Sequence, residues 1–392
     1  MTGTRYLVVG GGMTGDAACK GIREHDTDGT ITLVGAEPDP PYKRPPLTKG
    51  LWSGGDEAKI WRQTDEAGVD LRLGRRIVSI DPAARSATDD QGEEYSYERL
   101  LLATGGTPRQ LAGAPADVVY YRTLQDYRRV RELADRQARF AVIGGGFIGS
   151  ELAAALASNG CRVTMVFPEP GIAWRIFPSD LAEAVNTVYR DRGVEVLAGE
   201  TVTTVEGDGD EAVIRLGSGG SVRADAVIAG LGIEPTTALA EAIGLPTDNG
   251  IVVDEYGRVD GADGVFAAGD VARFPIALLG RNGRVEHEDH ANTHGRVVGA
   301  NMAGAAERYD HLPFFYSDLF DLGYEAVGDT DSRLRTVTHW VEPHGKGVVA
   351  YVDDDGRPVG FLLWDVWGKV DAARELIAAR EPVDEETVAQ LA

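Results

Sequence analysis

Six glycines, at two places in the sequence, have the spacing of a turn that receives a phosphate group. They are Gly10, Gly12 and Gly15 within YLVVGGGMTGDAACKGI (6–22), and Gly144, Gly146 and Gly149 within FAVIGGGFIGSELAAALASNG (140–160). In Gly-x-Gly-x-x-Gly the first glycine allows a tight turn, the second lets a pyrophosphate approach the backbone, and the third allows close helix–strand packing. The N-terminus of the following helix then faces the phosphates. The sequence therefore predicts two dinucleotide-binding turns.

An acidic residue follows the next apolar strand after each turn. Glu37 ends the strand region TITLVGA, and Glu169 lies in VFPEP. A carboxylate at this position accepts hydrogen bonds from ribose hydroxyls and repels a 2′-phosphate. At the second turn this favours NADH over NADPH, although Arg175 is close enough in sequence to act against that preference.

Two dinucleotides in one chain are best explained as an electron donor and an electron acceptor. One can be a permanently held flavin and the other a nicotinamide that binds and leaves. Hydride passes between them, and the cofactors supply the chemistry. The protein has only to bring the two rings together and adjust the charge around them.

The elements that must position these glycines form an alternating pattern. Short apolar runs such as TRYLVVG, RLLLATG, FAVIGG, CRVTMVF and ADAVIAGLG alternate with helical patterns, which indicates parallel sheets covered on both faces. From about residue 313 the runs alternate like antiparallel strands, with DDDG (353–356) as a hairpin turn and a helix in KVDAARELIAAR. We therefore predict an α/β chain with two Rossmann-like dinucleotide-binding domains and a small α+β C-terminal domain.

The predicted domain boundaries make the first domain discontinuous. We expect an FAD-binding domain at 1–118 and 248–312, an NAD-binding domain at 119–247, and a C-terminal domain of the interface or dimerisation type at 313–392. The chain of 392 residues is long enough for two or three such cores.

The composition limits the choice of partners and compartment. A formal net charge of −23 opposes binding to nucleic acid or to anionic lipid. No apolar run reaches the length of a membrane span, and the first strand begins at Tyr6, too early for a signal peptide. We expect a cytoplasmic protein. The acidic charge fits a high-salt cytoplasm and ordinary solubility about equally well.

The two cysteines, Cys19 and Cys161, are 142 positions apart and form no close dithiol spacing. We expect both to be small buried hydrophobic residues. A missing dithiol argues against disulfide reductases, and the absence of Cys from PYKRPPLTK argues against single-cysteine peroxidases.

Motifs beyond the two turns carry a family resemblance over nearly the whole chain. The first turn together with PPYKRPPLTKGLW (40–52), LLLATGGTPR (100–109) and GVFAAGD (264–270) resembles the FAD-binding signatures of pyridine-nucleotide-dependent flavoprotein reductases. Within that superfamily the chain resembles the apoptosis-inducing factor group, close kin of bacterial ferredoxin reductases. The most specific matches are LLATGGTPR, IGGGFIGSELA, VFPEPG, RVEHEDHA, SDLFDLGYEAVG and VGFLLWDVW.

The resemblance implies roles for individual residues on the FAD side. It implies that Asp270 binds the ribityl chain, that Arg44 and Arg122 contact the flavin nucleotide, and that Lys49 lies beside the reactive flavin N5 paired with Glu151. A buried ammonium needs such a carboxylate partner, and it stabilises a ring that gains negative charge on reduction. The complete FAD-side set is Gly10, Gly12, Gly15, Glu37, Arg44, Lys49, Thr104, Gly105, Arg122, Gly269, Asp270, Glu286, His287 and Tyr316.

On the NAD side, Phe147 and Ile148 are expected to face the nicotinamide, and Gly232 to lie against the same ring. The NAD-side set is Gly144, Gly146, Phe147, Ile148, Gly149, Glu151, Glu169, Gly232 and Glu325, and the residues expected to be catalytic are Lys49, Glu151 and His287. Glu286 and His287 are expected to begin a helix whose positive end faces the flavin pyrimidine edge.

That helix also allows a competing interpretation. His287, His290 and His294 share one helix face, next to carboxylates, and such a face could bind zinc. No recognised metal-ligand spacing is matched, however, and the resemblance places a flavin at the start of the helix. We therefore predict no metal site.

Two features depart from the family pattern. Tyr316 stands where the family often has Trp, which adds a hydroxyl beside the expected isoalloxazine ring. The long insertion of the animal proteins is missing from the C-terminal domain, so the apoptosis-related roles linked to it are not inherited.

The sequence thus predicts an FAD-dependent NAD(P)H oxidoreductase that moves hydride from NADH to FAD N5 and then to an acceptor. The acceptor is left open among an iron–sulfur protein, a quinone and oxygen. The alternatives are a ferredoxin or rubredoxin reductase, which the charge of −23 makes less easy, and a redox-sensing NADH-binding scaffold with slow turnover. A homodimer is compatible with any of them.

Overall fold

The computed structural model describes residues 2–115, 117–209 and 211–392. The chain forms two compact units. Unit 1 consists of Met1–Arg44, Asp56–Thr107 and Glu234–Pro313, and unit 2 consists of Pro45–Gly55, Pro108–Ile233 and Phe314–Ala392. Unit 1 resumes at Glu234, whereas the predicted boundary is at 248; the division into three domains stays a prediction.

Unit 1 is built on a seven-stranded sheet with the strand order β3-β2-β1-β6-β5-β4, and β17 also pairs with β6. Its strands are β1 (Thr2–Val9), β2 (Ile31–Gly35), β3 (Val69–Leu73), β4 (Ile77–Asp81), β5 (Ser86–Asp89), β6 (Glu94–Leu102) and β17 (Val265–Ala267). The strands β3, β2, β1, β6 and β17 are parallel to their neighbours in this group, so their carboxyl ends meet at one edge.

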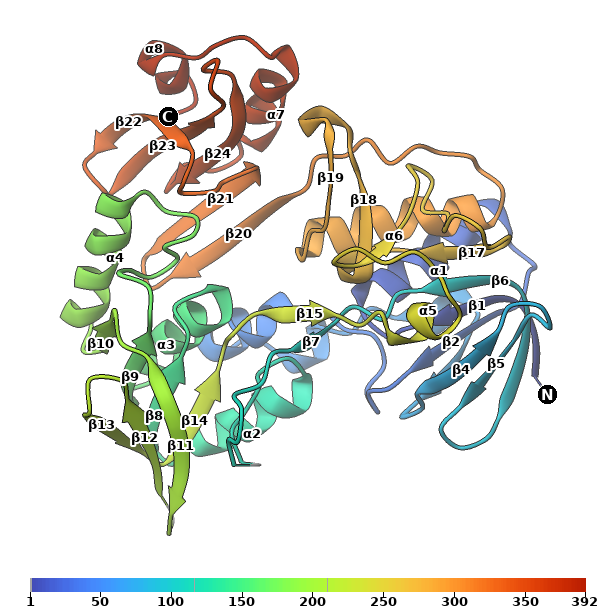
Figure 1. Cartoon of the computed structure of the whole chain (residues 1–392), viewed down its shortest axis with the longest axis horizontal. Coiled ribbons are helices and arrows are strands. Elements are labelled where there is room, and N and C mark those ends of the chain that lie inside the picture. Colours follow the sequence, from blue (N-terminus) through green and yellow to red (C-terminus); the bar gives the residue numbers. More distant parts are fainter. Residues whose placement is uncertain (1, 116, 210) are drawn as a thin grey trace. The chain divides into compact units, whose positions relative to one another are not determined.

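Two helices pack together beside this sheet (Figure 1). They are α1 (Met13–His25) and α6 (Glu288–Met302). The two backbones approach closely because glycines line the contact: a Cβ added to Gly21 would lie 2.1 Å from the Arg296 carbonyl oxygen, and one added to Gly299 would lie 2.1 Å from that of Ala18. Unit 1 also contains α5 (Ala238–Ala242) and a small sheet of β16 (Ile251–Val252), β18 (Ala272–Ile276) and β19 (Arg281–Gly283).

Unit 2 contains a second parallel sheet, with the order β10-β9-β8-β14. Its strands are β8 (Arg139–Ile143), β9 (Arg162–Phe167), β10 (Glu195–Ala198) and β14 (Ala226–Ala229), and its helices are α2 (Leu124–Asp135), α3 (Phe147–Ser158) and α4 (Ser179–Asp191). A three-stranded antiparallel sheet of β11 (Val202–Asp208), β12 (Glu211–Leu216) and β13 (Ser221–Ala224) is inserted before β14. The short strands β7 (Gly106–Pro108) and β15 (Ile233–Pro235) pair where the chain passes from one unit to the other.

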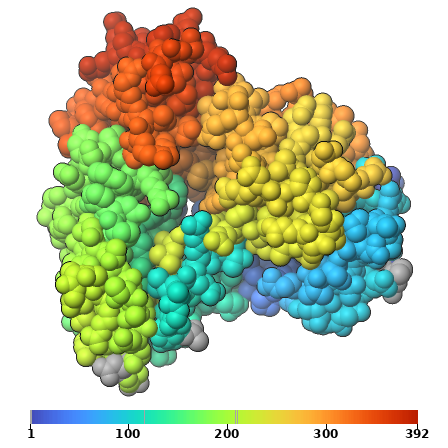
Figure 2. All heavy atoms as spheres, in the orientation of Figure 1, coloured from blue at the N-terminus to red at the C-terminus, as the bar shows by residue number. Residues whose placement is uncertain are grey.

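The C-terminal part of unit 2 is an antiparallel sheet, as predicted, with the order β20-β21-β24-β23-β22. It comprises β20 (Phe314–Leu319), β21 (Leu322–Gly328), β22 (Arg335–Glu342), β23 (Lys346–Val352), β24 (Pro358–Trp364), α7 (Val370–Ala379) and α8 (Glu385–Ala389). The hairpin turn at 353–356 is confirmed, with the Asp353 N–H donating to the Arg357 carbonyl. Figure 2 shows the orange-to-red spheres of this sheet resting on the green segment that contains α4. There Tyr189 and Phe320 meet edge to face at 5.0 Å, and the Tyr351 hydroxyl donates to the Ile176 carbonyl.

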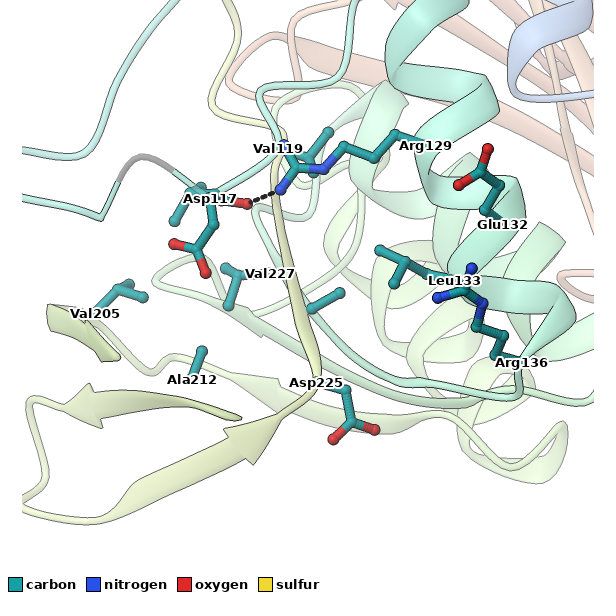
Figure 3. Close-up of a pocket in the computed structure, with 12 residues that line it drawn as sticks. Asp117, Val119, Arg129, Glu132, Leu133, Arg136, Val205, Ala212, Asp225 and Val227 are labelled. Carbon is teal, nitrogen blue, oxygen red and sulfur yellow. Dashed lines mark hydrogen bonds between the residues drawn. The ribbon is translucent and has the colours of Figure 1, made fainter. Parts of the chain in front are cut away.

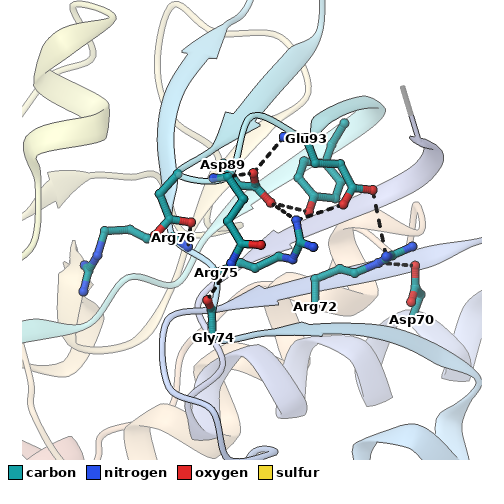
Figure 4. Close-up of polar contacts among 10 residues, drawn as sticks. Asp70, Arg72, Gly74, Arg75, Arg76, Asp89 and Glu93 are labelled. Carbon is teal, nitrogen blue, oxygen red and sulfur yellow. Dashed lines mark hydrogen bonds and ion pairs between the residues drawn. The ribbon is translucent and has the colours of Figure 1, made fainter.

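A buried carboxylate ties the antiparallel part of the unit 1 sheet to the loop after β3 (Figure 4). Asp89 accepts hydrogen bonds from the Arg75 guanidinium at 2.8 Å, the Tyr95 hydroxyl at 2.8 Å and the backbone N–H of Glu93 at 2.8 Å. Burial on its own would raise the pKa of Asp89, but these donors outweigh it and lower the pKa to about 2. The same loop donates from the Gly74 N–H to the Glu37 carbonyl, which holds Glu37 near the strand ends.

We expect Asp89→Asn to reduce the free energy of unfolding of unit 1 by about 2 kcal/mol at pH 7, because a carboxylate with a lowered pKa stabilises the fold above its unfolded pKa of about 3.9. That stabilisation is lost as the pH falls toward the folded pKa, so the gap between variant and parent narrows from pH 5 to pH 3. Urea unfolding at several pH values measures the gap. The exposed Asp65→Asn is the control, and a gap that does not vary with pH contradicts this account.

Candidate functional site

The predicted FAD-side residues of unit 1 lie at the carboxyl ends of its parallel strands. Gly10 follows β1, Glu37 follows β2, Thr104 and Gly105 follow β6, and Asp270 follows β17. Ligands of open α/β sheets bind at this edge. The structure thus brings these residues to one edge, together with Gly12, Gly15 and Gly269.

The first glycine turn has one open position and two filled ones. A Cβ added to Gly10 would lie 2.1 Å from the Ala103 carbonyl oxygen, and one added to Gly15 would lie 2.1 Å from that of Gly10. A Cβ on Gly12 would meet nothing within 4 Å. Gly10 also has a φ of +127°, which side chains rarely adopt. The open space at Gly12 fits the prediction that a pyrophosphate approaches the backbone at the middle glycine.

The second turn, between β8 and α3, repeats this division. A Cβ on Gly144 would lie 2.3 Å from the Gly230 carbonyl oxygen, and one on Gly149 would lie 2.0 Å from that of Gly144, whereas Gly146 has nothing within 4 Å. Gly146 caps α3 with φ −82° and ψ −166°, close to the φ −88° and ψ −171° of Gly12 at the start of α1. The two turns therefore present the same cradle to a dinucleotide.

Glu37 holds two neighbours from its own unit. Its carboxylate accepts from the Tyr42 hydroxyl at 2.5 Å and pairs with Arg44 at 2.5 Å. The structure thus brings together Glu37 and Arg44, which the sequence placed on the same nucleotide. Tyr42 was missed, because an aromatic residue among the prolines of PPYKRPP has no distinguishing signal.

The segment that leads into α6, and α6 itself, contain buried polar atoms that have no hydrogen-bond partner in the described structure. Among the described residues, such atoms are Tyr97 Oη, Arg284 Nε, His290 Nε2, Asn292 Oδ1 and His294 Nε2. All except the first lie on α6 or just before it. Two of these residues contact the Gly269–Asp270 turn: Arg284 donates to the Asp270 carbonyl at 3.1 Å, and His294 Nδ1 accepts from the Gly269 N–H at 3.3 Å. Buried polar groups normally have partners. These residues therefore fit a bound polar cofactor beside Asp270.

Helix α6 begins at Glu288, two residues later than predicted, with His287 as its N-cap and Glu286 before it. The extended backbone of His287 cannot continue the helix. Burial lowers the pKa of His287 to about 4 and that of His290 to about 3, so both imidazoles are neutral at pH 7. The catalytic role of His287 stays a prediction.

The histidine face of α6 is occupied by aromatic packing. His290 stacks on Phe274 at 4.6 Å and shares its Nδ1 with the Tyr309 hydroxyl at 2.9 Å, while His294 stacks on Tyr309 at 4.5 Å. In the part of the chain that the structure describes, no group of three His, Cys, Asp or Glu side chains is arranged to hold a metal ion.

Unit 2 contains the predicted pair of Lys49 and Glu151. Lys49 lies at the start of a short 3-10 helix, Gly50–Ser53, and Glu151 lies in the first turns of α3, two residues after Gly149. Their side chains are 12% and 6% exposed, and Lys49 Nζ is 2.5 Å from Glu151 Oε1. The ammonium also lies 5.5 Å from the ring centroid of Tyr316, a cation–π contact. The structure thus brings together three predicted residues.

Two hydroxyls that the sequence did not single out complete this cluster. Thr48 Oγ1 donates to Glu151 Oε2 at 2.5 Å, and Ser317 Oγ donates to Glu151 Oε1 at 2.6 Å. Thr48 is next to Lys49 in the sequence, and Ser317 is next to Tyr316. That neighbourhood was the only sequence signal that could have indicated a role for the two hydroxyls.

The NAD-side residues of unit 2 gather at the carboxyl ends of β8, β9 and β14. Glu169 follows β9, and Gly232, with a φ of +81°, follows β14. Phe147 at the start of α3 meets Phe315 edge to face at 5.1 Å, and Ile148 follows it in the helix. Two residues stand elsewhere in unit 2. Arg122 immediately precedes the N-cap of α2, and Glu325 on β21 accepts from the Gly368 N–H at 2.8 Å.

A pocket of about 180 Å³ in unit 2 lies away from these residues (Figure 3). It is lined by Asp117 and Arg129, which are joined by a hydrogen bond from the guanidinium to the Asp117 carbonyl, and by Asp225, Ala226 and Val227 at the amino end of β14. Dinucleotides bind at carboxyl ends, so this pocket is not the NAD site.

The comparisons with known proteins agree with this geometry. A family model described as pyridine nucleotide-disulphide oxidoreductase matches residues 4–295. The chain belongs to this family. A second model, apoptosis-inducing factor, mitochondrion-associated, C-term, matches residues 298–344. The oxidoreductase is therefore an FAD-dependent enzyme that uses NAD(H), and the predicted family resemblance is confirmed.

Several relatives are similar over nearly the whole chain. The oxidoreductase is 34% identical to the anthranilate 1,2-dioxygenase system ferredoxin–NAD(+) reductase component of Burkholderia cepacia, over 99% of this chain and 98% of that one. It is 31% identical to apoptosis-inducing factor 1, mitochondrial, of Dictyostelium discoideum, over 97% of this chain and 79% of that one. A crystal structure of the covalent putidaredoxin reductase–putidaredoxin complex matches with a TM-score of 0.92 and 28% identity, covering 99% of this chain and 96% of that one.

Nothing in the described structure supports the disulphide chemistry in the family name. Cys19 and Cys161 are both buried and unbridged, as predicted. Burial raises the pKa of each thiol, which disfavours the reactive thiolate. None of the described helices is long and apolar enough to cross a membrane.

Substitution of the middle glycine and of the last glycine in the first turn should have different effects, one on FAD binding and the other on stability. We expect Gly12→Ala to fold normally but to bind FAD about tenfold more weakly, a loss of roughly 1.4 kcal/mol, because its Cβ enters the space that a pyrophosphate needs. Gly15→Ala is expected to lower the melting temperature, because its Cβ would overlap the Gly10 carbonyl oxygen. Flavin absorbance per chain and thermal unfolding measure the two effects. Equal flavin loss in both variants without a difference in melting temperature contradicts this division.

Proposed function

We propose that this oxidoreductase takes electrons from NADH and passes them to an iron–sulfur protein of the ferredoxin type. The observation that carries the proposed electron uptake from NADH is the buried Lys49–Glu151 pair, because Glu151 lies two residues after Gly149, the last glycine of the second turn. The near full-length similarity to a ferredoxin–NAD(+) reductase component supports it. The missing dithiol supports it too, since electrons have no cysteine pair on which to leave.

The residues of this chain bind, orient and supply charge. The redox chemistry, which is acceptance of a hydride equivalent and release of electrons one or two at a time, would be supplied by bound FAD. Gly146 and the N-terminus of α3 would receive the NADH pyrophosphate, and Glu169 would accept hydrogen bonds from its ribose. Lys49 supplies a positive charge where negative charge develops, and Glu151 keeps that charge from being buried without a partner.

We further propose that NADH is preferred over NADPH. The Glu169 side chain is 31% exposed at the end of β9, where it repels a 2′-phosphate. Arg175, the residue that could reverse this preference, lies 3.8 Å from Glu169 but is 87% exposed, so solvent and salt screen its charge.

Glu169→Gln tests this preference. We expect the ratio of kcat/KM for NADH to that for NADPH to fall by about tenfold to a hundredfold, as for the loss of a charge-assisted hydrogen bond. Steady-state rates of flavin-dependent dye reduction with each nucleotide measure the ratio. The exposed Glu183→Gln on α4 should leave it unchanged. An unchanged ratio in the Glu169 variant argues against the proposed ribose contact.

The acceptor is identified by reducing the protein with NADH anaerobically and then mixing it with single acceptors. We expect a [2Fe–2S] ferredoxin to reoxidise the flavin faster than rubredoxin, a soluble quinone or oxygen. Faster reoxidation by quinone or oxygen overturns the proposed acceptor. A long-lived reduced complex with every acceptor favours a redox-sensing role instead.

A further inference from the structure

The Glu151 carboxylate is held by three donors that leave it little freedom. Oε1 receives Lys49 Nζ at 2.5 Å and Ser317 Oγ at 2.6 Å, and Oε2 receives Thr48 Oγ1 at 2.5 Å. Glu151 is 5% exposed, Thr48 is 7% exposed, and Ser317 is fully buried. A buried carboxylate is tolerated only when such donors satisfy it.

The two hydroxyls come from segments that are themselves fixed. Thr48 belongs to the turn in which the Leu47 carbonyl accepts from Trp52 Nε1 at 2.7 Å and from the Tyr121 hydroxyl at 2.5 Å. Ser317 lies in the middle of β20, directly opposite Tyr324 of β21. The carboxylate orientation is therefore set by a turn on one side and by a strand of the C-terminal sheet on the other.

A second carboxylate, Asp318, lies close enough to Lys49 to be affected by its charge. Asp318, next to Ser317, is exposed to solvent over much of its surface. Desolvation of its carboxyl raises its pKa, and the charge of Lys49 opposes that rise. Tyr316 also offers its ring face to Lys49. Lys49 thus forms an ion pair with Glu151, and two hydroxyls anchor that carboxylate.

We propose that Ser317 and Thr48 are positioning residues, which orient the Glu151 carboxylate so that Lys49 is held in one place. They act through Glu151, to which both hydroxyls donate. Their effect on the flavin rests on the proposed function, whereas their effect on Lys49 does not. The C-terminal sheet thereby contributes, through Ser317, to the charge arrangement at the reactive site.

The test uses the ammonium of Lys49 as a direct reporter. The chain has six lysines, so a protein labelled with 15N at lysine Nζ gives few signals, and Lys49→Arg assigns the one of interest. In the holoprotein we expect exchange of the Lys49 ammonium protons with water to be slow. In Ser317→Ala and in Thr48→Val we expect it to be at least about tenfold faster, because the carboxylate that holds Lys49 can rotate. Ser317→Thr and Thr48→Ser should restore slow exchange.

A matched control and a second readout separate positioning from general loosening. Thr330→Val removes another buried hydroxyl of the same unit and should leave Lys49 exchange unchanged. The midpoint potential of bound flavin should fall in Ser317→Ala, by about 30 mV for a tenfold smaller two-electron equilibrium constant. Unaltered Lys49 exchange in Ser317→Ala overturns the proposal, and so does an equal effect of Thr330→Val. Faster Lys49 exchange in Ser317→Ala with an unaltered midpoint potential overturns the proposed effect of Ser317 on the flavin. A parent protein that contains no flavin contradicts the proposed function but does not affect the Lys49 exchange result.

Discussion

The buried carboxylate of Glu151 joins three separate segments of unit 2. A charge with 5% exposure has to be satisfied within the protein, and its donors come from the turn at Pro45–Gly55 and from β20. Removing one partner of a buried pair costs about 3–5 kcal/mol, because the other charge is then left without compensation. The turn and the C-terminal sheet therefore belong to the same compact unit as α3, the helix after the second glycine turn, although they are distant from it in sequence.

The repeated glycine turn is a second constraint, and it explains why the chain contains two similar halves. In both turns the outer glycines are demanded by backbone carbonyls about 2 Å from a hypothetical Cβ, whereas the middle glycine faces open space. The outer pair is thus required by the fold, and the space at the middle glycine is left open, as the proposed binding of a dinucleotide requires. A sequence motif that looks uniform therefore serves two separate physical requirements.

Much of this organisation could be predicted from the sequence, for identifiable reasons. Strand ends and glycine spacing are local, so the turns, Glu37 and Glu169 were found from the residues alone. The Lys49–Glu151 pair joins residues 102 positions apart; it was predicted only through the family resemblance, and the structure contains it. Thr48 and Ser317 could not be predicted, because a hydroxyl beside a motif residue reveals nothing about where it points. The start of α6 was placed two residues early, because the backbone of His287 is extended although its sequence suits a helix.

The central claim is that NADH bound at the second glycine turn delivers hydride to FAD bound at the first. Anaerobic stopped-flow mixing of the purified holoprotein with NADH, and with NADH deuterated at the transferred position of C4, tests it most directly. We expect flavin absorbance to bleach in a single fast phase that deuteration slows by a primary isotope effect. Purified protein without flavin absorbance would contradict the account. Bleaching at a rate that deuteration does not change, in the parent protein and in a Gly146→Ala variant alike, would contradict it too.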